Sequence, residues 1–368
     1  MTSRTLSIAF YAPLKAPDHP VPSGDRLMAR LLVAALQAAG HRVQVVSALR
    51  AYRGDPQDHA GWVALQAAAD AERARIAALW RGGMRPDLWF CYHPYYKAPD
   101  LLGPSLTAAF GLPYVTCEAS YSQRRNVGIW AAMQAVMLDG LRGAAVNLCL
   151  TARDHAGLVA VDPGLPLAML PPFIDTLPFA APPTPEPGHL VTVAMMRAGD
   201  KGDSYARLAA ALRLLPVGLP WHLTVAGDGP MRDAVVAMFD GVPADRITWA
   251  GLLPPGAVAG LLARGALYVW PGYGEAYGLA YLEAQAAGLP VVACRIAGVP
   301  EVVEDGVTGV LVAAGDDAVF AGAIAGLLAD PTRAARIGAV ARDRVEARHA
   351  FPVAVQRLDR LLQGVVGG

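Results

Sequence analysis

Short apolar runs alternate with longer helical patterns along the chain, and this alternation is the strongest constraint on the fold. Continuous apolar strands separated by helices are typical of a parallel sheet that helices cover on both faces. In the first half, strands are expected at 6–12, 42–48, 88–93, 113–119 and 145–151. Helices are expected at 24–40, near 61–81 and near 127–142. The pattern therefore predicts a doubly wound α/β domain.

A Pro-rich segment, LPFAAPPTPEPGHL at 177–190, interrupts the alternation. Its prolines lack an N–H group and disfavour helix, so the segment is interpreted as an extended linker between domains. A loop within one domain is the alternative. After it the pattern restarts, with strands expected at 190–196, 222–228, 247–252, 266–270 and 290–294.

The chain is expected to end in helices at 316–329, 332–347 and 352–364. The predicted organisation has four parts. They are an N-terminal domain at 1–177, a linker at 178–189, a second domain at 190–348, and a final helix at 349–368 that packs back on the first domain.

Composition excludes several classes of protein. With 54% hydrophobic and 17% charged residues the chain is globular, and 31 basic against 31 acidic residues argue against nucleic acid as a partner. The four cysteines lie in or beside apolar runs without a CxxC pair, which favours buried thiols in a reducing cytoplasm. No signal-peptide pattern and no apolar run of transmembrane length is present, so a cytoplasmic location is expected.

Two glutamates stand out in the stretch PGYGEAYGLAYLEAQAAGLPVVA. Glu275 lies in a Gly-rich loop after the strand expected at 266–270, and Glu283 lies in the helix that follows. In doubly wound sheets, ligands bind outside the carboxyl ends of the strands. Carboxylates accept hydrogen bonds from sugar hydroxyls, and a helix N-terminus binds phosphate. A nucleotide sugar offers hydroxyls, a diphosphate and further hydroxyls in that order.

Two cations are expected at the same edge of the sheet. Arg197 and Lys201 lie in MMRAGDKGDSYARL, directly after the first strand of the second domain. Both can neutralise the charge that develops on a departing nucleotide. A solvated loop with ordinary surface charges is the alternative. Gly227, in VAGDGPMRD, permits close approach of the backbone, although a plain tight turn explains it equally well.

Taken together and in order, these motifs resemble the donor domain of the retaining GT-B glycosyltransferases, in particular glycosyltransferase family 4 (glycosyl transferases group 1). The motifs that carry the resemblance are Arg197, Lys201-Gly202, Gly227 to Pro230, Pro271 to Ala284 and Gly298 to Glu301. The resemblance implies the GT-B fold, in which two Rossmann-like domains face a central cleft. The absence of a G-x-G-x-x-G motif argues against a nicotinamide cofactor.

The resemblance also implies roles on the donor side. Glu275 would contact the hydroxyls of the transferred sugar, Glu283 would bind the ribose, and Arg197 and Lys201 would stabilise the diphosphate. The spacing of Arg197 and Lys201 is one residue shorter than in the family. Backbone groups near Ala276, Tyr277, Gly278 and Leu279 would hold the distal phosphate and sugar, and Ser23 and Gly24 match the loop beneath the donor phosphates.

The acceptor side departs from the family. The loop after the fourth strand often contains a histidine, but here VTCEASYSQRRN at 115–126 offers Glu118 and Arg124 instead. His93, which ends the third strand, and His19 in the first loop are the other candidates. A structural role is the alternative for both histidines.

The helix expected at 127–142, VGIWAAMQAVMLDGLR, is very apolar. It is interpreted either as a helix at a membrane surface that meets a lipid-linked acceptor, or as a helix packed in the core. Peripheral contact with the cytoplasmic face of a membrane is therefore left open.

The motifs together with the resemblance predict a glycosyltransferase that moves a hexose from a UDP- or GDP-linked sugar to an acceptor hydroxyl, and the resemblance implies that the anomeric configuration is retained. The acceptor is a sugar, a lipid-linked glycan or a small molecule, as in polysaccharide, glycolipid or other glycoconjugate biosynthesis. No D-x-D motif occurs, so no metal and no cofactor is expected beyond the nucleotide sugar. The alternatives are a nucleotide-sugar epimerase or hydrolase, and a non-catalytic nucleotide-sugar-binding subunit.

Overall fold

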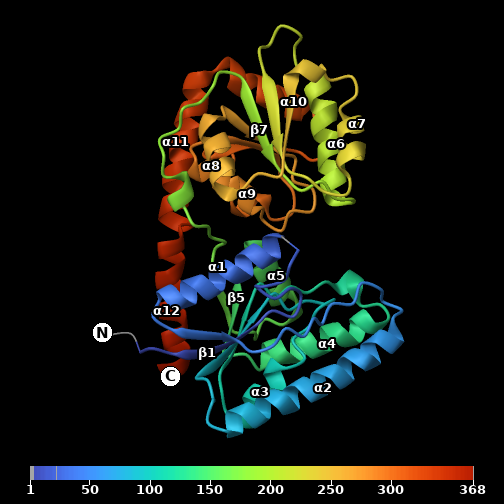
Figure 1. The fold of residues 1–368 in the computed structure, drawn as a ribbon, viewed down its shortest axis with the longest axis vertical. Helices are drawn as coiled ribbons and strands as arrows, with labels where there is room; N and C mark the ends of the chain where they lie inside the picture. Colours follow the sequence, from blue (N-terminus) through green and yellow to red (C-terminus); the bar gives the residue numbers. More distant parts are fainter. Residues whose placement is uncertain (1–3, 22, 368) are drawn as a thin grey trace. The chain divides into compact units, whose positions relative to one another are not determined.

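The computed structural model describes residues 4–21 and 23–367, which form two compact units. The first unit runs to Pro171 and includes the C-terminal residues from Phe351, and the second is Pro172–Ala350. Each unit contains one parallel six-stranded sheet with helices packed on its faces (Figure 1). Both predicted α/β domains are therefore present.

The sheet of the first unit has the strand order β2-β1-β3-β4-β5-β6. Its strands are β1 (Ser7–Tyr11), β2 (Arg42–Val45), β3 (Leu88–Tyr92), β4 (Tyr114–Cys117), β5 (Val146–Cys149) and β6 (Leu167–Met169). Its helices are α1 (Gly24–Ala38), α2 (His59–Arg81), α3 (Gly103–Phe110), α4 (Ile129–Arg142), α5 (Ala152–Val161) and α12 (Phe351–Gly367).

The sheet of the second unit has the order β12-β11-β10-β7-β8-β9. Its strands are β7 (His189–Val193), β8 (His222–Ala226), β9 (Ile247–Gly251), β10 (Leu267–Val269), β11 (Val291–Cys294) and β12 (Gly309–Val312). Its helices are α6 (Asp200–Arg213), α7 (Arg232–Met238), α8 (Pro255–Arg264), α9 (Leu279–Ala286), α10 (Asp317–Ala329) and α11 (Pro331–Arg348).

In each sheet the chain first adds strands on one side of the first strand and then continues on its other side. In the first unit β1 pairs with both β2 and β3, and in the second unit β7 pairs with both β8 and β10. Chain connections leave neighbouring strands for opposite faces at such a point, which opens a crevice at the carboxyl ends of the strands. The loops after β1 and β3, and those after β7 and β10, are therefore where a ligand site is expected.

The Pro-rich segment belongs to the second unit. Thr184 and Glu186 donate their backbone N–H groups to the carbonyls of Ala263 and Arg264 at the end of α8, at 2.7 and 2.8 Å. These bonds hold the segment along α8 instead of leaving it extended between domains. The two units divide between Pro171 and Pro172, ahead of the boundary predicted after residue 177.

The final helix packs on the first unit. His41, which precedes β2, lies 3.3 Å from the carboxylate of Asp359 on α12, and Gln363 donates a hydrogen bond of 2.7 Å to the carbonyl of Arg4. An amphipathic helix of this length buries its apolar stripe, and α12 packs against α1 with Leu358 and Leu362 buried.

The core explains the apolar character of α4. All five residues of β3 are buried, as expected for a parallel strand covered on both faces. Trp130, Met133 and Met137 of α4 are buried as well, so the helix packs in the core of the first unit.

Among residues 4–21 and 23–367, no helix is both long and apolar enough to span a membrane. The four cysteines are buried free thiols.

Candidate functional site

An ion pair joins Lys201 and Glu275 in the loops that follow the neighbouring strands β7 and β10. Lys201 lies in the first turn of α6, after β7, and Glu275 lies in the loop between β10 and α9. Lys201 Nζ contacts Glu275 Oε1, and Trp270 Nε1 donates a hydrogen bond of 3.1 Å to the same oxygen. Two predicted site residues separated by 74 positions are thus brought together at the carboxyl edge of the sheet.

The loop that carries Glu275 is shaped by close approaches of its backbone. Gly274 has a φ of +67°, and a Cβ atom there would lie 2.1 Å from the carboxylate of Asp200, at the start of α6. A Cβ atom at Gly298 would lie 1.4 Å from the carbonyl oxygen of Ala276. Only glycine fits at either position, and the fixed loop holds Glu275 beside Lys201.

Glu283 lies on the second turn of α9, and its carboxylate is desolvated. Burial raises the pKa of Glu283 to about 7. Within the described part of the chain, no side chain or backbone donor forms a hydrogen bond or ion pair with this carboxylate. Helix α9 begins at Leu279, and Gly278 before it, whose φ is +79°, provides no side-chain cap. Both features suit a ligand that supplies hydroxyl donors and an anion.

The other predicted donor-side residues lie around this pair. Arg197 is half-buried in the loop after β7, Ala276 is exposed, and Tyr277 and Leu279 are buried. Gly227 follows β8 with a φ of +154°, and a Cβ atom there would lie 1.8 Å from the carbonyl of Ala194. The close approach of two loops therefore accounts for Gly227 within the protein itself.

In the first unit, Asp25, His93 and Glu118 gather at the corresponding edge of the sheet. His93 follows β3 and Glu118 follows β4, while Asp25 lies in the first turn of α1. His93 Nδ1 lies 3.3 Å from Asp25 Oδ1, and Tyr92 donates a hydrogen bond of 2.8 Å to Glu118. His93 and Glu118 have φ values of +58° and +61°, which are strained for residues with side chains and concentrate at functional sites.

The charges of this trio are coupled. Burial raises the pKa of Glu118 to about 7, although the His93 charge opposes the shift. Burial disfavours the charged form of His93, but the carboxylates of Glu118 and Asp25 outweigh it and raise the pKa of His93 to about 9. The opposite charges of His93 and Glu118 thus favour the charged form of each group, while their shared burial opposes it.

The remaining predicted residues of the first unit have local structural contacts. Ser23 caps α1 by accepting a hydrogen bond of 3.2 Å from the backbone of Arg26, and it also accepts one of 2.9 Å from Lys15 Nζ. No atom of the described residues beyond its chain neighbours lies within 4 Å of a Cβ built on Gly24. His19 accepts a hydrogen bond of 3.2 Å within its own loop. Arg124 is exposed in the short turn before α4.

Sequence reasoning missed two residues of these clusters, Asp25 and Trp270. Asp25 directly follows Ser23-Gly24, where an acidic residue in the first turn of a helix is ordinarily interpreted as a capping charge. Trp270 was included in an apolar strand, and nothing in the sequence shows that its indole N–H reaches Glu275.

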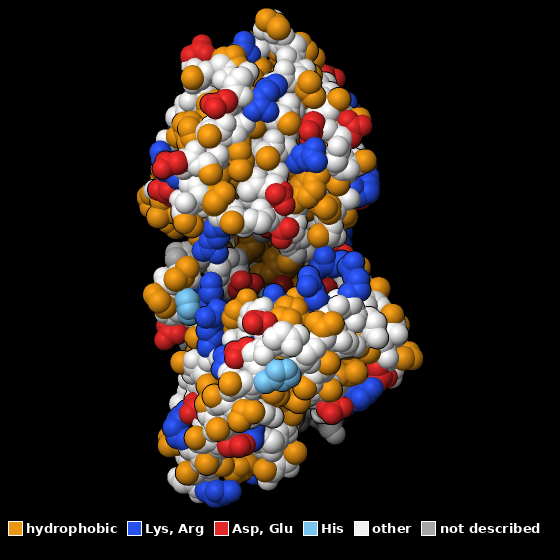
Figure 2. Space-filling view, turned by 90° about the vertical axis from the view of Figure 1, so that its right-hand side faces the viewer, with side chains coloured by type: hydrophobic (Ala, Val, Ile, Leu, Met, Phe, Trp, Pro, Cys, Tyr) orange, Lys and Arg blue, Asp and Glu red, His pale blue; other side chains and the backbone are white. Residues whose placement is uncertain are grey.

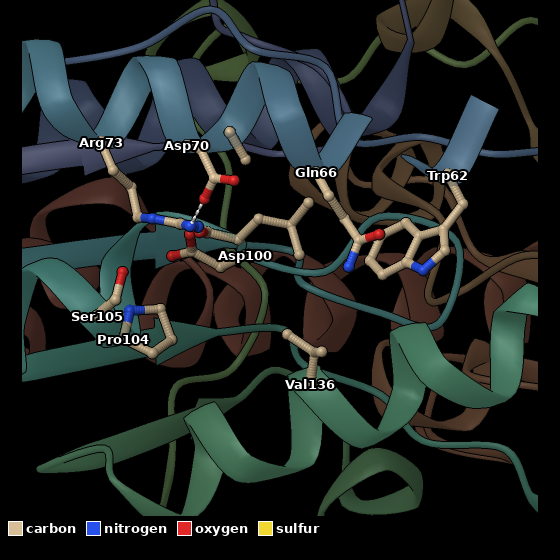
Figure 3. A pocket seen from close by; sticks show the side chains of 10 residues that line it. Trp62, Gln66, Asp70, Arg73, Asp100, Pro104, Ser105 and Val136 are labelled. Atoms are coloured by element: carbon tan, nitrogen blue, oxygen red, sulfur yellow. Dashed lines mark hydrogen bonds and ion pairs between the residues drawn. The ribbon is translucent and has the colours of Figure 1, made fainter. Parts of the chain in front are cut away.

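A cavity of about 310 Å³ lies elsewhere, between α2, α3 and α4 of the first unit (Figure 3). Asp100, Arg73 and Trp62 are among its lining residues. Asp100 accepts hydrogen bonds from Trp89, from Tyr114 and from the backbone of Leu102 and Gly103. These bonds occupy both oxygens of the carboxylate, so Asp100 organises the fold and the cavity contains none of the predicted site residues.

Among the residues that the structure describes, one group has the side chains and the spacing to ligate a metal ion. Glu186, His189 and His222 place their ligand atoms within 4.8 Å of one another. They lie at the amino ends of β7 and β8, at the opposite edge of the sheet from Lys201 and Glu275. His189 already contacts Thr224 through Nε2 at 2.9 Å, and its ring stacks on His222 at 4.2 Å. This arrangement is explained by packing at the start of the sheet.

Known proteins resemble the chain in sequence and in structure. Residues 188–330 match the model of the family described as Glycosyl transferases group 1. A D-inositol 3-phosphate glycosyltransferase of Mycobacterium avium is 36% identical over 204 residues, which cover 54% of this chain and 46% of that protein. The chain therefore spans less than half the length of this curated relative.

Two solved structures share the fold over nearly the whole chain. A sucrose-phosphate synthase from Thermosynechococcus elongatus has a TM-score of 0.75 at 19% identity and covers 99% of this chain and 100% of its own. HepE from Anabaena, solved in complex with UDP-glucose, has a TM-score of 0.71 at 14% identity over 98% of this chain and 100% of its own. The fold is therefore that of the GT-B glycosyltransferases, as predicted.

Proposed function

Because the second unit contains a domain of the glycosyl transferases group 1 family, we propose that the protein is a glycosyltransferase. It moves a hexose from a UDP- or GDP-linked sugar to an acceptor hydroxyl. The observation that carries this proposal is the pairing of Lys201 with Glu275 at the β7–β10 crevice. When the donor binds, its diphosphate replaces Glu275 as the partner of Lys201. The released carboxylate then accepts hydrogen bonds from the hexose.

Catalysis on this account consists of positioning and leaving-group stabilisation. Lys201 and Arg197 neutralise the charge that grows on the diphosphate as the glycosidic bond breaks. The uncapped N-terminus of α9 adds backbone donors for the distal phosphate. We propose that these groups suffice without a metal ion, and that the transferred hexose keeps its anomeric configuration, as in the family that the motifs resemble.

Glu283 is proposed to bind the ribose hydroxyls of the donor. Its carboxylate is desolvated and has no protein hydrogen-bond donor within the described chain. Hydrogen bonds from two ribose hydroxyls would therefore offset the free-energy cost of burying this carboxylate. The Asp25, His93 and Glu118 cluster is proposed to bind the acceptor. The charged His93 donates to the acceptor oxygen, and Glu118 orients the hydroxyl that attacks.

A transfer assay with matched variants tests the proposal. The wild type, Lys201→Met and Glu275→Gln are incubated with UDP-glucose or GDP-mannose and a panel of sugar and glycolipid acceptors. Both variants should lose at least about 100-fold in rate, because each removes a group that stabilises the transition state. Arg207→Met, on the same helix α6 but paired with Asp317, is the control and should retain activity. Transfer at near wild-type rates by both site variants would contradict the assignment.

Further readouts separate the alternatives and test metal independence and retention. Release or epimerisation of the sugar without acceptor would indicate a hydrolase or epimerase, and binding without any turnover would indicate a non-catalytic subunit. Undiminished transfer in EDTA is expected for a metal-independent enzyme. Retention is checked from the anomeric proton coupling of the product by NMR.

A further inference from the structure

Three cations of the first unit lie against aromatic rings beside the acceptor-side cluster. Lys97 Nζ lies 4.7 Å from the ring centre of Trp130 and 5.6 Å from that of Tyr96. Arg125 Cζ lies 6.0 and 5.8 Å from the same two rings. Arg50 Cζ lies 4.8 Å above Tyr52. These six residues are called the cationic aromatic patch.

The positive charges of the patch have no acidic counterpart. Within residues 4–21 and 23–367, no carboxylate forms an ion pair with Arg50, Lys97 or Arg125. By contrast, the neighbouring Arg53 lies 3.7 Å from Asp58. Burial and the like charge of Arg125 lower the pKa of Lys97. Lys97 and Arg125 thus stay close together although they repel each other, and such an arrangement is typical of a site for an anion.

The patch lies at the sheet edge that carries the acceptor-side cluster. Lys97 follows β3, Arg50 follows β2, and Arg125 lies between β4 and α4. The ring of Tyr95 lies 5.0 Å from His93 and 5.2 Å from Tyr96, so a single aromatic residue separates the cluster from the patch. Lys and Arg side chains gather on the surface of the first unit in Figure 2.

We propose that the cationic aromatic patch binds a phosphate group of the acceptor. The proposal rests on the proposed transferase activity, because it names the chemical class of the acceptor. Arg50 and Arg125 supply forked N–H donors and Lys97 a compact charge, and the aromatic faces hold all three in place. The tyrosine ring between the patch and His93 gives the acceptor's sugar or polyol ring a surface to pack on. A phosphorylated sugar and a phosphate-containing lipid headgroup share this chemistry.

The first experiment measures binding of inorganic phosphate to the full-length chain by calorimetry. Lys201→Met serves as the background, so that the donor site contributes little. Adding Lys97→Met and Arg125→Gln together should weaken phosphate binding by about 100-fold, since each charge-assisted contact is worth about tenfold or more. Arg81→Gln is the control, because Arg81 lies over Phe110 at the far end of α2. Unchanged melting temperatures establish that the variants are folded.

The second experiment distinguishes the two sources of phosphate. The site is assigned to a lipid headgroup if the wild type co-sediments with phosphatidylglycerol vesicles but not with phosphatidylcholine vesicles, and if the Lys97→Met/Arg125→Gln variant loses this co-sedimentation. The site is assigned to a soluble acceptor if the variant loses binding of inorganic phosphate while its behaviour with vesicles is that of the wild type. If the variant binds both probes as the wild type does, the proposal is overturned.

The donor provides an independent check. UDP-glucose should raise the melting temperature of the Lys97→Met/Arg125→Gln variant as much as that of the wild type, since the patch is not part of the donor site. If UDP-glucose and GDP-mannose stabilise neither protein, the proposed function fails, while the phosphate titration still decides whether the patch binds an anion.

Discussion

Replacing Glu283 by Gln should stabilise the free protein at neutral and alkaline pH. The pKa of the Glu283 carboxyl group is about 7 in the folded chain, against an ordinary value of 4.5. A group with a raised pKa binds its proton more tightly in the folded state, so it destabilises the fold increasingly as pH rises from 4.5 to 7. The amide of Gln has nearly the same shape and never ionises.

The size of the effect follows from the shift. A tenfold change in proton affinity corresponds to about 1.4 kcal/mol, so raising the pKa of Glu283 from 4.5 to about 7 sets an upper bound of about 3 kcal/mol above pH 7. The side chain is half-buried, and partial solvent screening lowers the expected gain to about 1–2 kcal/mol. Near pH 4 the carboxyl group is neutral in both states and the two proteins should be equally stable.

Urea denaturation of wild type and Glu283→Gln at pH 4, 6 and 8 measures the gain directly. The difference in unfolding free energy should be close to zero at pH 4 and should grow toward pH 8. Glu346→Gln, on the exposed face of α11, is the matched control and should show no such trend. A Glu283→Gln protein that is less stable than wild type at pH 8 would refute the reasoning, because it would mean that the carboxylate has stabilising partners.

Three further outcomes are expected. Lys201→Met should abolish the rise in melting temperature produced by UDP-glucose or GDP-mannose in a thermal-shift assay, since it removes a cation from the diphosphate. Gly298→Ala should lower the unfolding free energy by about 1–3 kcal/mol in urea, because the new Cβ would overlap the carbonyl of Ala276, whereas Gly256→Ala in the open surroundings of α8 should not. Because the pKa of His93 is raised from 6.5 to about 9, its charge stabilises the fold below pH 6.5. That contribution is lost as pH rises through 9, and His93→Gln should flatten this loss in a pH series of unfolding free energies.

The long elements were predictable because each has a single, repeated pattern. The strands with continuous apolar runs, such as β3 and β8, and the amphipathic helices α1 and α12 lie close to where the sequence places them. Helix α3 and strand β6 were not predicted, although α9 and β10, which have the same lengths, were. Eight or three residues alone are too few to establish a period, and α9 and β10 were placed by the motif that spans them. Helix α5 had a usable signal, since Thr151 caps it by accepting a hydrogen bond from the backbone of Asp154.

The strand order could not be read from the sequence, and this limits what could be predicted of the site. From the order and spacing of the motifs, Lys201 and Glu275 were predicted to bind the same ligand. The ion pair that joins them depends on β7 and β10 being neighbours. In the same way, Asp25 contacts His93 only because β1 pairs with β3. Interactions set by strand adjacency and loop geometry leave no periodic trace in a single chain.

The central claim is that a nucleoside diphosphate sugar binds at the β7–β10 crevice and takes Lys201 away from Glu275. A crystal structure of the protein with UDP-glucose or GDP-mannose tests it most directly. The account predicts that Lys201 Nζ lies within hydrogen-bonding distance of the diphosphate and that Glu275 contacts hexose hydroxyls. A complex in which the diphosphate binds elsewhere, with the Lys201–Glu275 ion pair intact, would contradict it.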